Sequence, residues 1–310
     1  MKNMTNTITI NPPSDIRDLA VFLGEMNKDS SSHVGYCGES EEGIYQILLN
    51  DFSDLDLSQS FAVAYEKGCI VGAIGLDIDK ADFSAEVWGP FISDKIDDPY
   101  VIDEILAAVI SYSSIQLKHI SFFLNKKNTR GKEFVLKHGG IEKGHHEILL
   151  ARRDELEEVD IDEIEKYSPQ YEQSFSELHK AAFPSTYYNA EEILSRQNEM
   201  NQLFIMTNGD QCIKGYVYIE AQPLHDVGSI EYIAVSNQNR KQGVGTRLIK
   251  YALVNLFSFN EIEKISLCVE KENEKAIKLY RAAGFRMKHE LIHFKITFSG
   301  CEEIVHDNYN

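Results

Sequence analysis

The chain has 310 residues, of which 43% are hydrophobic and 26% are charged, so it contains enough apolar material for two globular domains. Its 31 basic and 49 acidic side chains give a formal net charge of -18, which argues against a nucleic-acid partner because no basic patch offsets the repulsion between the protein and phosphates. No apolar run reaches the roughly 20 residues that span a bilayer, and residues 1–18 lack the apolar stretch of an export signal, so we expect a cytoplasmic protein with no membrane partner.

In chain order, the first half contains two segments that recur in the second half. Residues 120–128 (ISFFLNKKN) match residues 265–273 (ISLCVEKEN) at an offset of 145, and the match continues through a helical pattern to Gly139 and Gly284. Further upstream, the segment that begins at Cys69 matches the one at Cys212 at an offset of 143. A period this long indicates a duplicated domain. We expect a first domain over residues 1–155 and a second over 156–310, joined by an acidic segment at 152–162.

The second half alternates helices and strands. A helix is expected over 171–182, and Asn189 with Glu192 three residues later has the pattern of a capping box that opens the next helix. Alternation of strands and helices predicts an α/β fold of the α+β type, built on a mixed sheet. The further elements expected are strands at 203–207, 213–220, 229–235, 264–269 and 291–298, a turn at 208–210, and helices from near 245 and over 274–283.

A glycine-containing segment, RKQGVG at 240–245, lies between an apolar strand and an amphipathic helix. Gly243 and Gly245 have no Cβ, so the backbone there can approach a ligand closely. The unpaired N–H groups of the first helical turn point at an anion, and Arg240 and Lys241 add positive charge. The segment therefore predicts a binding site for a pyrophosphate, although a tight turn with a glycine cap would explain a GxG pattern on its own.

A second segment, NEKAIKLYRAAGF at 273–285, also has a helical pattern. Asn273 is suited to cap this helix and Gly284 to end it. By itself the segment is compatible with a purely structural role, in which Tyr280 is a partly buried aromatic residue.

In this order, the two segments resemble the paired motifs of the GNAT superfamily of N-acetyltransferases, and the similarity covers residues 203–298. The resemblance implies two tandem GNAT-like domains, with a sheet that splays between the fourth and fifth strands of the second one to admit acetyl-CoA. The pantetheine arm would add to the edge of 233–235 like a strand, and Tyr280 would protonate the departing thiolate. The residues implied in cofactor binding are Ile233, Ala234, Val235, Arg240, Lys241, Gln242, Gly243, Val244, Gly245, Thr246 and Asn273.

Direct attack on the thioester needs an unprotonated amine, and Glu231 is the first candidate for the general base. Residues 231, 233 and 235 share one face of a regular strand, and this parity is similar to that of the catalytic glutamate in several members of the superfamily. A solvent-exposed strand carboxylate is an equal alternative, and Glu220 and His225 are further candidates. A backbone N–H near Val235 would stabilise the oxyanion.

The acceptor is expected to be a small-molecule or peptide amine. Tyr187 and Tyr188 precede the Asn189 helix, where their rings could stack on a cation or simply pack the loop. The five cysteines contain no CxxC pair, and His145 and His146 have no acidic or cysteine partners at a suitable spacing, so no metal is expected.

The first half lacks the cofactor residues at the 145 offset. Val135 corresponds to Tyr280. Asp98 and Tyr100, within the sequence IDDPY at 96–100, correspond to Gly243 and Gly245. Acidic residues repel a pyrophosphate and proline has no N–H to donate, although Glu86 matches Glu231. We expect this half to be a degenerate, non-catalytic copy that shapes a substrate cleft or replaces the second subunit of a dimer.

The sequence therefore predicts an N-acetyltransferase that moves an acetyl group from acetyl-CoA to a primary amine, as a monomer or homodimer. A non-catalytic acyl-CoA-binding or sensing module is an alternative of a different class, and transfer from a longer acyl-CoA is a third. Tyr280 and the glycine segment favour the enzyme over the sensor.

Overall fold

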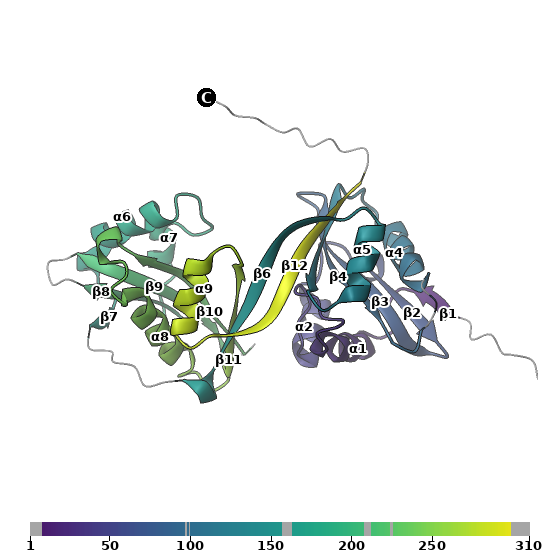
Figure 1. The fold of residues 1–310 in the computed structure, drawn as a ribbon, viewed down its shortest axis with the longest axis horizontal. Helices are drawn as coiled ribbons and strands as arrows, with labels where there is room; N and C mark the ends of the chain where they lie inside the picture. Colours follow the sequence, from purple (N-terminus) through teal and green to yellow (C-terminus); the bar gives the residue numbers. More distant parts are fainter. Residues whose placement is uncertain are drawn as a thin grey trace, which may run out of the picture. The chain divides into compact units, whose positions relative to one another are not determined.

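The computed structural model of the chain describes residues 8–96, 98, 100–156, 163–207, 212–223 and 226–298 (Figure 1). These residues belong to two compact units, one formed by the chain up to His146 together with the chain from His289 onward, and one formed by Glu147–Lys288. No helix among the described residues is long and apolar enough to cross a membrane. The turn expected at 208–210, His225, and residues 97, 99 and 301 lie outside the described part of the chain.

Polar side chains set the start of several helices in the first unit. Asp15, Ser40 and Asn128 each accept a hydrogen bond from the backbone N–H three residues ahead, which satisfies one of the donors left unpaired in the first turn of the helix. The helices are α1 (Ile16–Lys28), α2 (Glu41–Asn50), α3 (Leu57–Ser60), α4 (Val101–Tyr112) and α5 (Thr129–Lys137).

Within the first unit the strands of the sheet have the order β1-β2-β3-β4-β5-β12, so a strand from the C-terminal part of the chain lies beside β5. Strand β12 pairs antiparallel with β5 from Leu291 opposite Asn125 to Thr297 opposite His119. Its Ile292, Phe294 and Ile296 are buried in the core of this unit. Burial of each such side chain stabilises the fold by roughly 1.5–3 kcal/mol relative to leaving it exposed. The strands are β1 (Ile8–Asn11), β2 (Phe61–Glu66), β3 (Cys69–Asp79), β4 (Ser84–Ile92), β5 (His119–Asn125) and β12 (Arg286–Thr297).

The second unit is built around the antiparallel sheet β10-β9-β8-β7. One face of this sheet packs against α8 and the other against α6 and α7, and each face has its own apolar core (Figure 1). Strand β11 belongs to the other sheet, next to β6, so β10 is an edge strand. The strands are β6 (Ile141–Arg152), β7 (Ile164–Lys166), β8 (Asn201–Thr207), β9 (Ile213–Gln222), β10 (Val227–Val235) and β11 (Lys264–Glu270); the helices are α6 (Glu172–Ala182), α7 (Ala190–Ser195), α8 (Val244–Leu256) and α9 (Glu274–Ala282).

These elements confirm the mixed α/β fold. The capping box at Asn189 is present in full, since the Asn189 side chain accepts from the Glu192 N–H and the Glu192 carboxylate accepts from the Asn189 N–H. The break between β10 and β11 is the splay that the resemblance implied between the fourth and fifth strands of the second half.

The duplication is visible in the bounds of matching elements, but its offset changes along the chain. Helices α5 and α9 each have nine residues and strands β6 and β12 each have twelve, and both pairs are 145 positions apart. Strands β4 and β10 have nine residues each and are 143 positions apart. The counterparts of Gly243 and Glu231 are therefore Tyr100 and Trp88, whereas the uniform offset of 145 pointed to Asp98 and Glu86. A uniform offset was wrong here because the connections between the strands differ in length.

The single boundary expected at 155/156 does not separate the two units. Residues 147–152 of β6 belong to the second unit, where Leu149 and Ala151 are buried, and β12 from His289 onward belongs to the first. The last strand expected to complete the second half thus completes the first unit. The alternation of apolar residues indicates which face of a strand is buried, but it does not indicate which strand lies beside it.

Candidate active site

The glycine segment forms the N-terminus of α8. Gly243 is the N-cap residue and has a φ of 79°, a left-handed conformation that suits glycine, and a Cβ added there would meet no atom within 4 Å. Within the described residues no side chain caps this helix, and its first turn carries no acidic residue. The N–H groups of the first turn and the helix dipole are therefore available to an anion.

Arg240, Lys241 and Gln242, directly before Gly243, are exposed and shape the approach to the helix. Lys241 has a φ of 61°, and the Arg240 Nε donates to the Val235 carbonyl over 3.3 Å. The Gln242 side chain donates to the Gln238 carbonyl over 3.0 Å. These contacts tie the segment to the end of β10, so the expected anion site and the edge of β10 adjoin each other.

Gly245 has a packing role that the sequence did not indicate. It is buried, and an added Cβ would lie 3.1 Å from Leu279 Cδ1 and 3.5 Å from Val235 Cγ2. The lack of a side chain at this position lets β10, α8 and α9 meet. Val244 is also buried, Thr246 is half-buried, and Ile233 and Val235 pack on the same face of β10.

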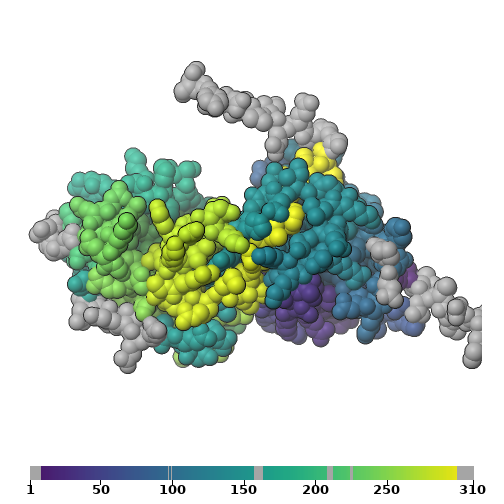
Figure 2. Space-filling model, viewed as in Figure 1, coloured from purple at the N-terminus to yellow at the C-terminus, as the bar shows by residue number. Residues whose placement is uncertain are grey.

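Tyr280 and Asn273 belong to α9, whose residues form part of the surface of the second unit (yellow in Figure 2). Asn273 caps the helix, and its side chain accepts from the Ala276 N–H over 3.2 Å. The Tyr280 ring packs edge-on against Phe285 at 5.5 Å between centroids, and burial raises the pKa of its hydroxyl. No other described residue hydrogen bonds to this hydroxyl. It therefore keeps its proton at neutral pH and has it available for a ligand.

Glu231 occupies a β-bulge in β10. The register with β9 passes from Ile230 opposite Ile219 directly to Tyr232 opposite Tyr218, which leaves Glu231 as the extra residue. The alternation that placed Glu231 on the face of Ile233 is therefore interrupted at Glu231 itself. Its side chain is exposed and forms no hydrogen bond or ion pair with another described residue.

The Glu231 carboxylate lies close enough to Tyr188 to act on it electrostatically. Partial burial, followed by the carboxylate of Glu220, raises the pKa of Tyr188, and Glu231 adds to the same direction. Glu220 is 13% exposed at its side chain and accepts hydrogen bonds from Arg196 and from the Tyr218 hydroxyl. The bulge therefore brings Glu231 into a polar group of residues on the side of the sheet that carries α6 and α7.

The two tyrosines before α7 differ in their surroundings. Tyr187 is 83% exposed. Tyr188 already stacks on a cation of its own chain, because the Arg196 guanidinium lies 4.2 Å from the centroid of its ring. Sequence reasoning did not find Arg196, at the end of α7, or the residues that hold Tyr188, since α6 and β10 supply these from separate segments.

The first unit does not reproduce the anion site at the end of its fourth strand. Tyr100 is the N-cap of α4 in a right-handed conformation, and Asp103 and Glu104 lie in the first turn. Burial raises the pKa of Asp103, but hydrogen bonds from Lys137 and His138 hold it below its usual value, so this acid stays ionised. Two acidic residues at a helix N-terminus disfavour a pyrophosphate. Val135, the counterpart of Tyr280, is fully buried.

A cavity of about 600 Å³ remains in the first unit. Strands β4 and β5 pair in parallel only from Ser84 to Glu86, and the cavity lies beyond that point, between the end of β4 and the start of α5. Its charged residues balance in sign, so it lacks the positive field that a pyrophosphate needs. They are the acids Glu25, Asp29 and Asp94 and the bases Lys95, Lys127 and Arg130.

A cluster of His33, Glu39 and His289 in the first unit has the side-chain types of a metal site. The Asn125 amide is oriented by the Lys127 N–H, which donates to its Oδ1, so its Nδ2 donates to His289 Nδ1 over 3.0 Å. His289 therefore carries its hydrogen on Nε2, which donates to Glu39 over 3.0 Å, and this tautomer cannot ligate a metal through Nε2. His145 and His146 do not belong to this cluster, since His145 bonds to Glu142 and His146 packs against Phe123.

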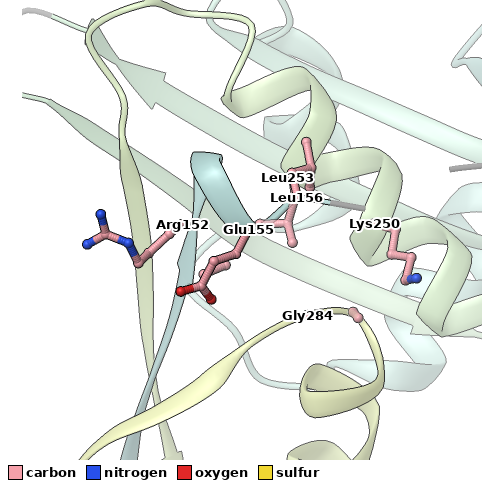
Figure 3. A pocket seen from close by; sticks show the side chains of 8 residues that line it. Arg152, Glu155, Leu156, Lys250, Leu253 and Gly284 are labelled. Carbon is pink, nitrogen blue, oxygen red and sulfur yellow. The ribbon is translucent and has the colours of Figure 1, made fainter. Parts of the chain in front are cut away.

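A second depression lies in the second unit, between η1 (Arg153–Glu155), α8 and the turn after α9 (Figure 3). Its volume is about 10 Å³, the size of a single water. The side chains of Arg152 and Lys250 extend from it in opposite directions (Figure 3). It is too small for a substrate and offers no converging charge.

The second half of the chain is similar to a known protein family. Residues 165–285 match the acetyltransferase (GNAT) family, whose members use acetyl-CoA in general. Spermidine N(1)-acetyltransferases of Escherichia coli K12 and Escherichia coli O157:H7 are each 41% identical over 61 residues, which cover 20% of this chain and 33% of each relative. The match thus spans about a third of the length of these curated relatives.

Solved structures share the fold of the whole chain at low sequence identity. A GCN5-related N-acetyltransferase from Sphaerobacter thermophilus superposes with a TM-score of 0.65 at 16% identity, over 94% of this chain and 95% of the other. A tandem GNAT protein from the clavulanic acid biosynthesis pathway gives 0.59 at 12% identity, over 94% and 98%. The chain therefore contains, at residues 165–285, a domain that matches the GNAT family of acetyltransferases.

Proposed function

We propose that the second unit transfers an acetyl group from acetyl-CoA to a primary amine by direct attack of the amine on the thioester. The observation that carries this proposal is the uncapped N-terminus of α8 at Gly243, beside the unpaired edge of β10. The first unit, in this proposal, is a non-catalytic copy, because Tyr100, Asp103 and Val135 replace the features that a cofactor needs.

The second unit offers groups that suit the parts of acetyl-CoA. The backbone N–H groups of Gln242 to Thr246 would hold the pyrophosphate, with Arg240 and Lys241 adding positive charge. The free edge of β10 at Ile233, Ala234 and Val235 offers N–H and C=O groups to the pantetheine amides, and Asn273 lies at the end of the neighbouring helix. Acetyl-CoA supplies an activated acyl group as a thioester.

Two side chains have properties that suit the proton transfers. Glu231 forms no hydrogen bond or ion pair with another described residue, so its carboxylate can take a proton from the substrate ammonium, directly or through water, and leave the neutral amine that attacks the thioester. The Tyr280 hydroxyl has a raised pKa and so holds a proton that it can give to the departing thiolate sulfur. A backbone N–H at the end of β10 would stabilise the oxyanion.

The acceptor that the site favours is a cationic amine. Glu231 and Glu220, which forms an ion pair with Arg196, lie near Tyr188, and the chain carries a net charge of -18, which attracts cations over a distance. The relatives that share 41% identity over 61 residues carry the name spermidine N(1)-acetyltransferase, so a polyamine is the first acceptor to test.

A coupled assay for the free thiol of CoA tests the proposal, with acetyl-CoA and a panel of polyamines, aminoglycosides and peptide N-termini. We expect release of CoA that depends on at least one amine. Tight binding of acetyl-CoA without transfer to any amine would favour an acyl-CoA sensor instead. Faster release from a longer acyl-CoA would keep the enzyme and change its donor.

A further inference from the structure

Both backbone polar atoms of Tyr188 are held by side chains from other elements. The Tyr188 N–H donates to the Tyr232 hydroxyl over 3.0 Å, and the Tyr188 carbonyl accepts from His179 Nε2 over 2.9 Å. Thr186, two residues earlier, also donates to the Tyr232 hydroxyl, over 2.8 Å. The loop before α7 is thus tied to α6 through His179 and to β10 through Tyr232, the residue that follows Glu231.

The tautomer of His179 is defined by its partners. A carbonyl only accepts, so Nε2 must carry the hydrogen that His179 gives to Tyr188, and Nδ1 accepts from the Tyr216 hydroxyl over 2.5 Å. His179 is 2% exposed, and burial lowers its pKa, so the ring stays neutral at physiological pH. Burial also raises the pKa of Tyr216, which therefore keeps its proton as the donor.

Tyr188, whose backbone is held in this way, lies beside the polar residues of the proposed acceptor site. The Tyr188 ring stacks on Arg196, which is bound to Glu220, and the phenol is within electrostatic reach of Glu231. A shift of the Tyr188 backbone would therefore displace the Tyr188 ring. It would also disturb the ion pair on which the ring stacks and the surroundings of the candidate base Glu231.

We propose that His179 and Tyr232 are positioning residues that fix Tyr188 at the acceptor site and so set the affinity for a cationic amine such as spermidine. This inference rests on the proposed function but concerns amine binding, not acyl transfer. Tyr232 precedes the proposed pantetheine edge at Ile233–Val235, but its side chain packs in the core on the side of α6 and α7, whereas Ile233 and Val235 pack on the side of α8. His179 lies on α6, so we expect acetyl-CoA binding to depend on neither side chain.

The test compares three variants by titration calorimetry with spermidine, on protein saturated with CoA so that no turnover occurs. Tyr232→Phe keeps the ring and removes the acceptor of the Tyr188 N–H, and His179→Phe removes the donor to the Tyr188 carbonyl. Each should raise the Kd of spermidine by roughly tenfold, as expected for losing one hydrogen bond to a placed group. His179→Gln keeps an N–H near the position of Nε2 and should restore part of the affinity.

Tyr171→Phe is the matched control, because Tyr171 belongs to the same apolar core and its hydroxyl bonds to Glu165 instead of the loop. Its spermidine Kd should stay within twofold of the wild type, and the Kd of CoA should not change in any variant. Hydrogen exchange of a peptide over residues 184–190 should be faster in Tyr232→Phe than in Tyr171→Phe, because the Tyr188 N–H loses its acceptor.

A wild-type spermidine Kd in folded Tyr232→Phe and His179→Phe would overturn the inference, as would a parallel loss of CoA affinity. Absence of spermidine binding to the wild type would also overturn it. Spermidine binding that responds to the variants as described, together with no transfer to any amine, would instead refute the proposed function and leave the positioning role standing.

Discussion

Gly243 and Tyr100 occupy the same place in the two copies of the fold, 143 positions apart, as the N-caps of α8 and α4. Gly243 adopts a φ of 79° and leaves its helix end open, whereas Tyr100 has a φ of -86° and precedes two acidic residues. The open helix end at Gly243 suits an anion, whereas the two acidic residues after Tyr100 disfavour one.

Gly243→Asp should weaken acetyl-CoA binding by at least 100-fold, because it places a negative charge at the proposed pyrophosphate site. Gly243→Asn has the same shape, tolerates a left-handed φ and carries no charge, so it is the matched control and should lose much less affinity. Titration calorimetry measures both Kd values. Equal affinities for the two variants would show that the pyrophosphate lies elsewhere.

Acetyl-CoA should bind once per chain, since the first unit has Tyr100 and ionised Asp103 where the second has an open helix end. The stoichiometry in the same titration checks this expectation. Two equivalent sites per chain would contradict the non-catalytic assignment of the first unit and would make its 600 Å³ cavity a cofactor site.

Tyr280→Phe should lower kcat by roughly 10²–10⁴-fold, the usual contribution of general acid–base catalysis, while the Kd of acetyl-CoA changes little. The substitution keeps the ring that packs against Phe285 and removes only the hydroxyl. Tyr251→Phe, on α8 and in the same apolar core, is the control and should keep the wild-type kcat. A wild-type kcat in Tyr280→Phe would mean that the thiolate takes its proton from water.

Glu231→Gln should depress the rate mainly at low pH. At low pH the amine is largely protonated and needs a base, whereas at high pH more of it is already neutral, so the variant should recover part of its rate as the pH rises. The pH profile of kcat/KM for wild type and variant measures this. A rate reduced by the same factor at every pH would argue against a base at Glu231 and for a role in binding the cation.

Asp77→Asn should stabilise the chain more at pH 8 than at pH 5. Asp77 lies opposite Glu86 on the neighbouring strand, and burial, followed by the charges of Asp54 and Asp79, raises its pKa to about 6. A raised carboxyl pKa contributes stability that is fully present below the unfolded pKa near 3.9 and is lost as the pH rises through about 6.

The difference in unfolding free energy between Asp77→Asn and wild type should therefore grow by roughly 1 kcal/mol from pH 5 to pH 8, allowing for partial solvent screening. Urea unfolding of the full chain at both pH values measures it. Asp82→Asn, at an exposed position on the same hairpin, should show no such change. A constant difference for Asp77→Asn would refute the titration of Asp77 in this range.

Local features of the second unit followed from the sequence because each depends on residues a few positions apart. The caps at Asn189 and Asn273, the start of α8 next to Gly243 and the matching bounds of α5 and α9 all rest on hydrogen bonds within one turn of helix. For the same reason the repeated segments, which fold locally in the same way, revealed the duplication.

Tertiary structure alone decided the partner of β12, the bulge at Glu231 and the clamp on Tyr188. A strand takes its neighbour from any segment with a free edge, and alternation of apolar residues fixes only its faces, so the pairing of β12 with β5 could not be inferred. The bulge depends on the register with β9, and the clamp joins His179 on α6 to Tyr232 on β10. Hydrogen bonds between groups this far apart in the chain exist only once the fold has brought them together.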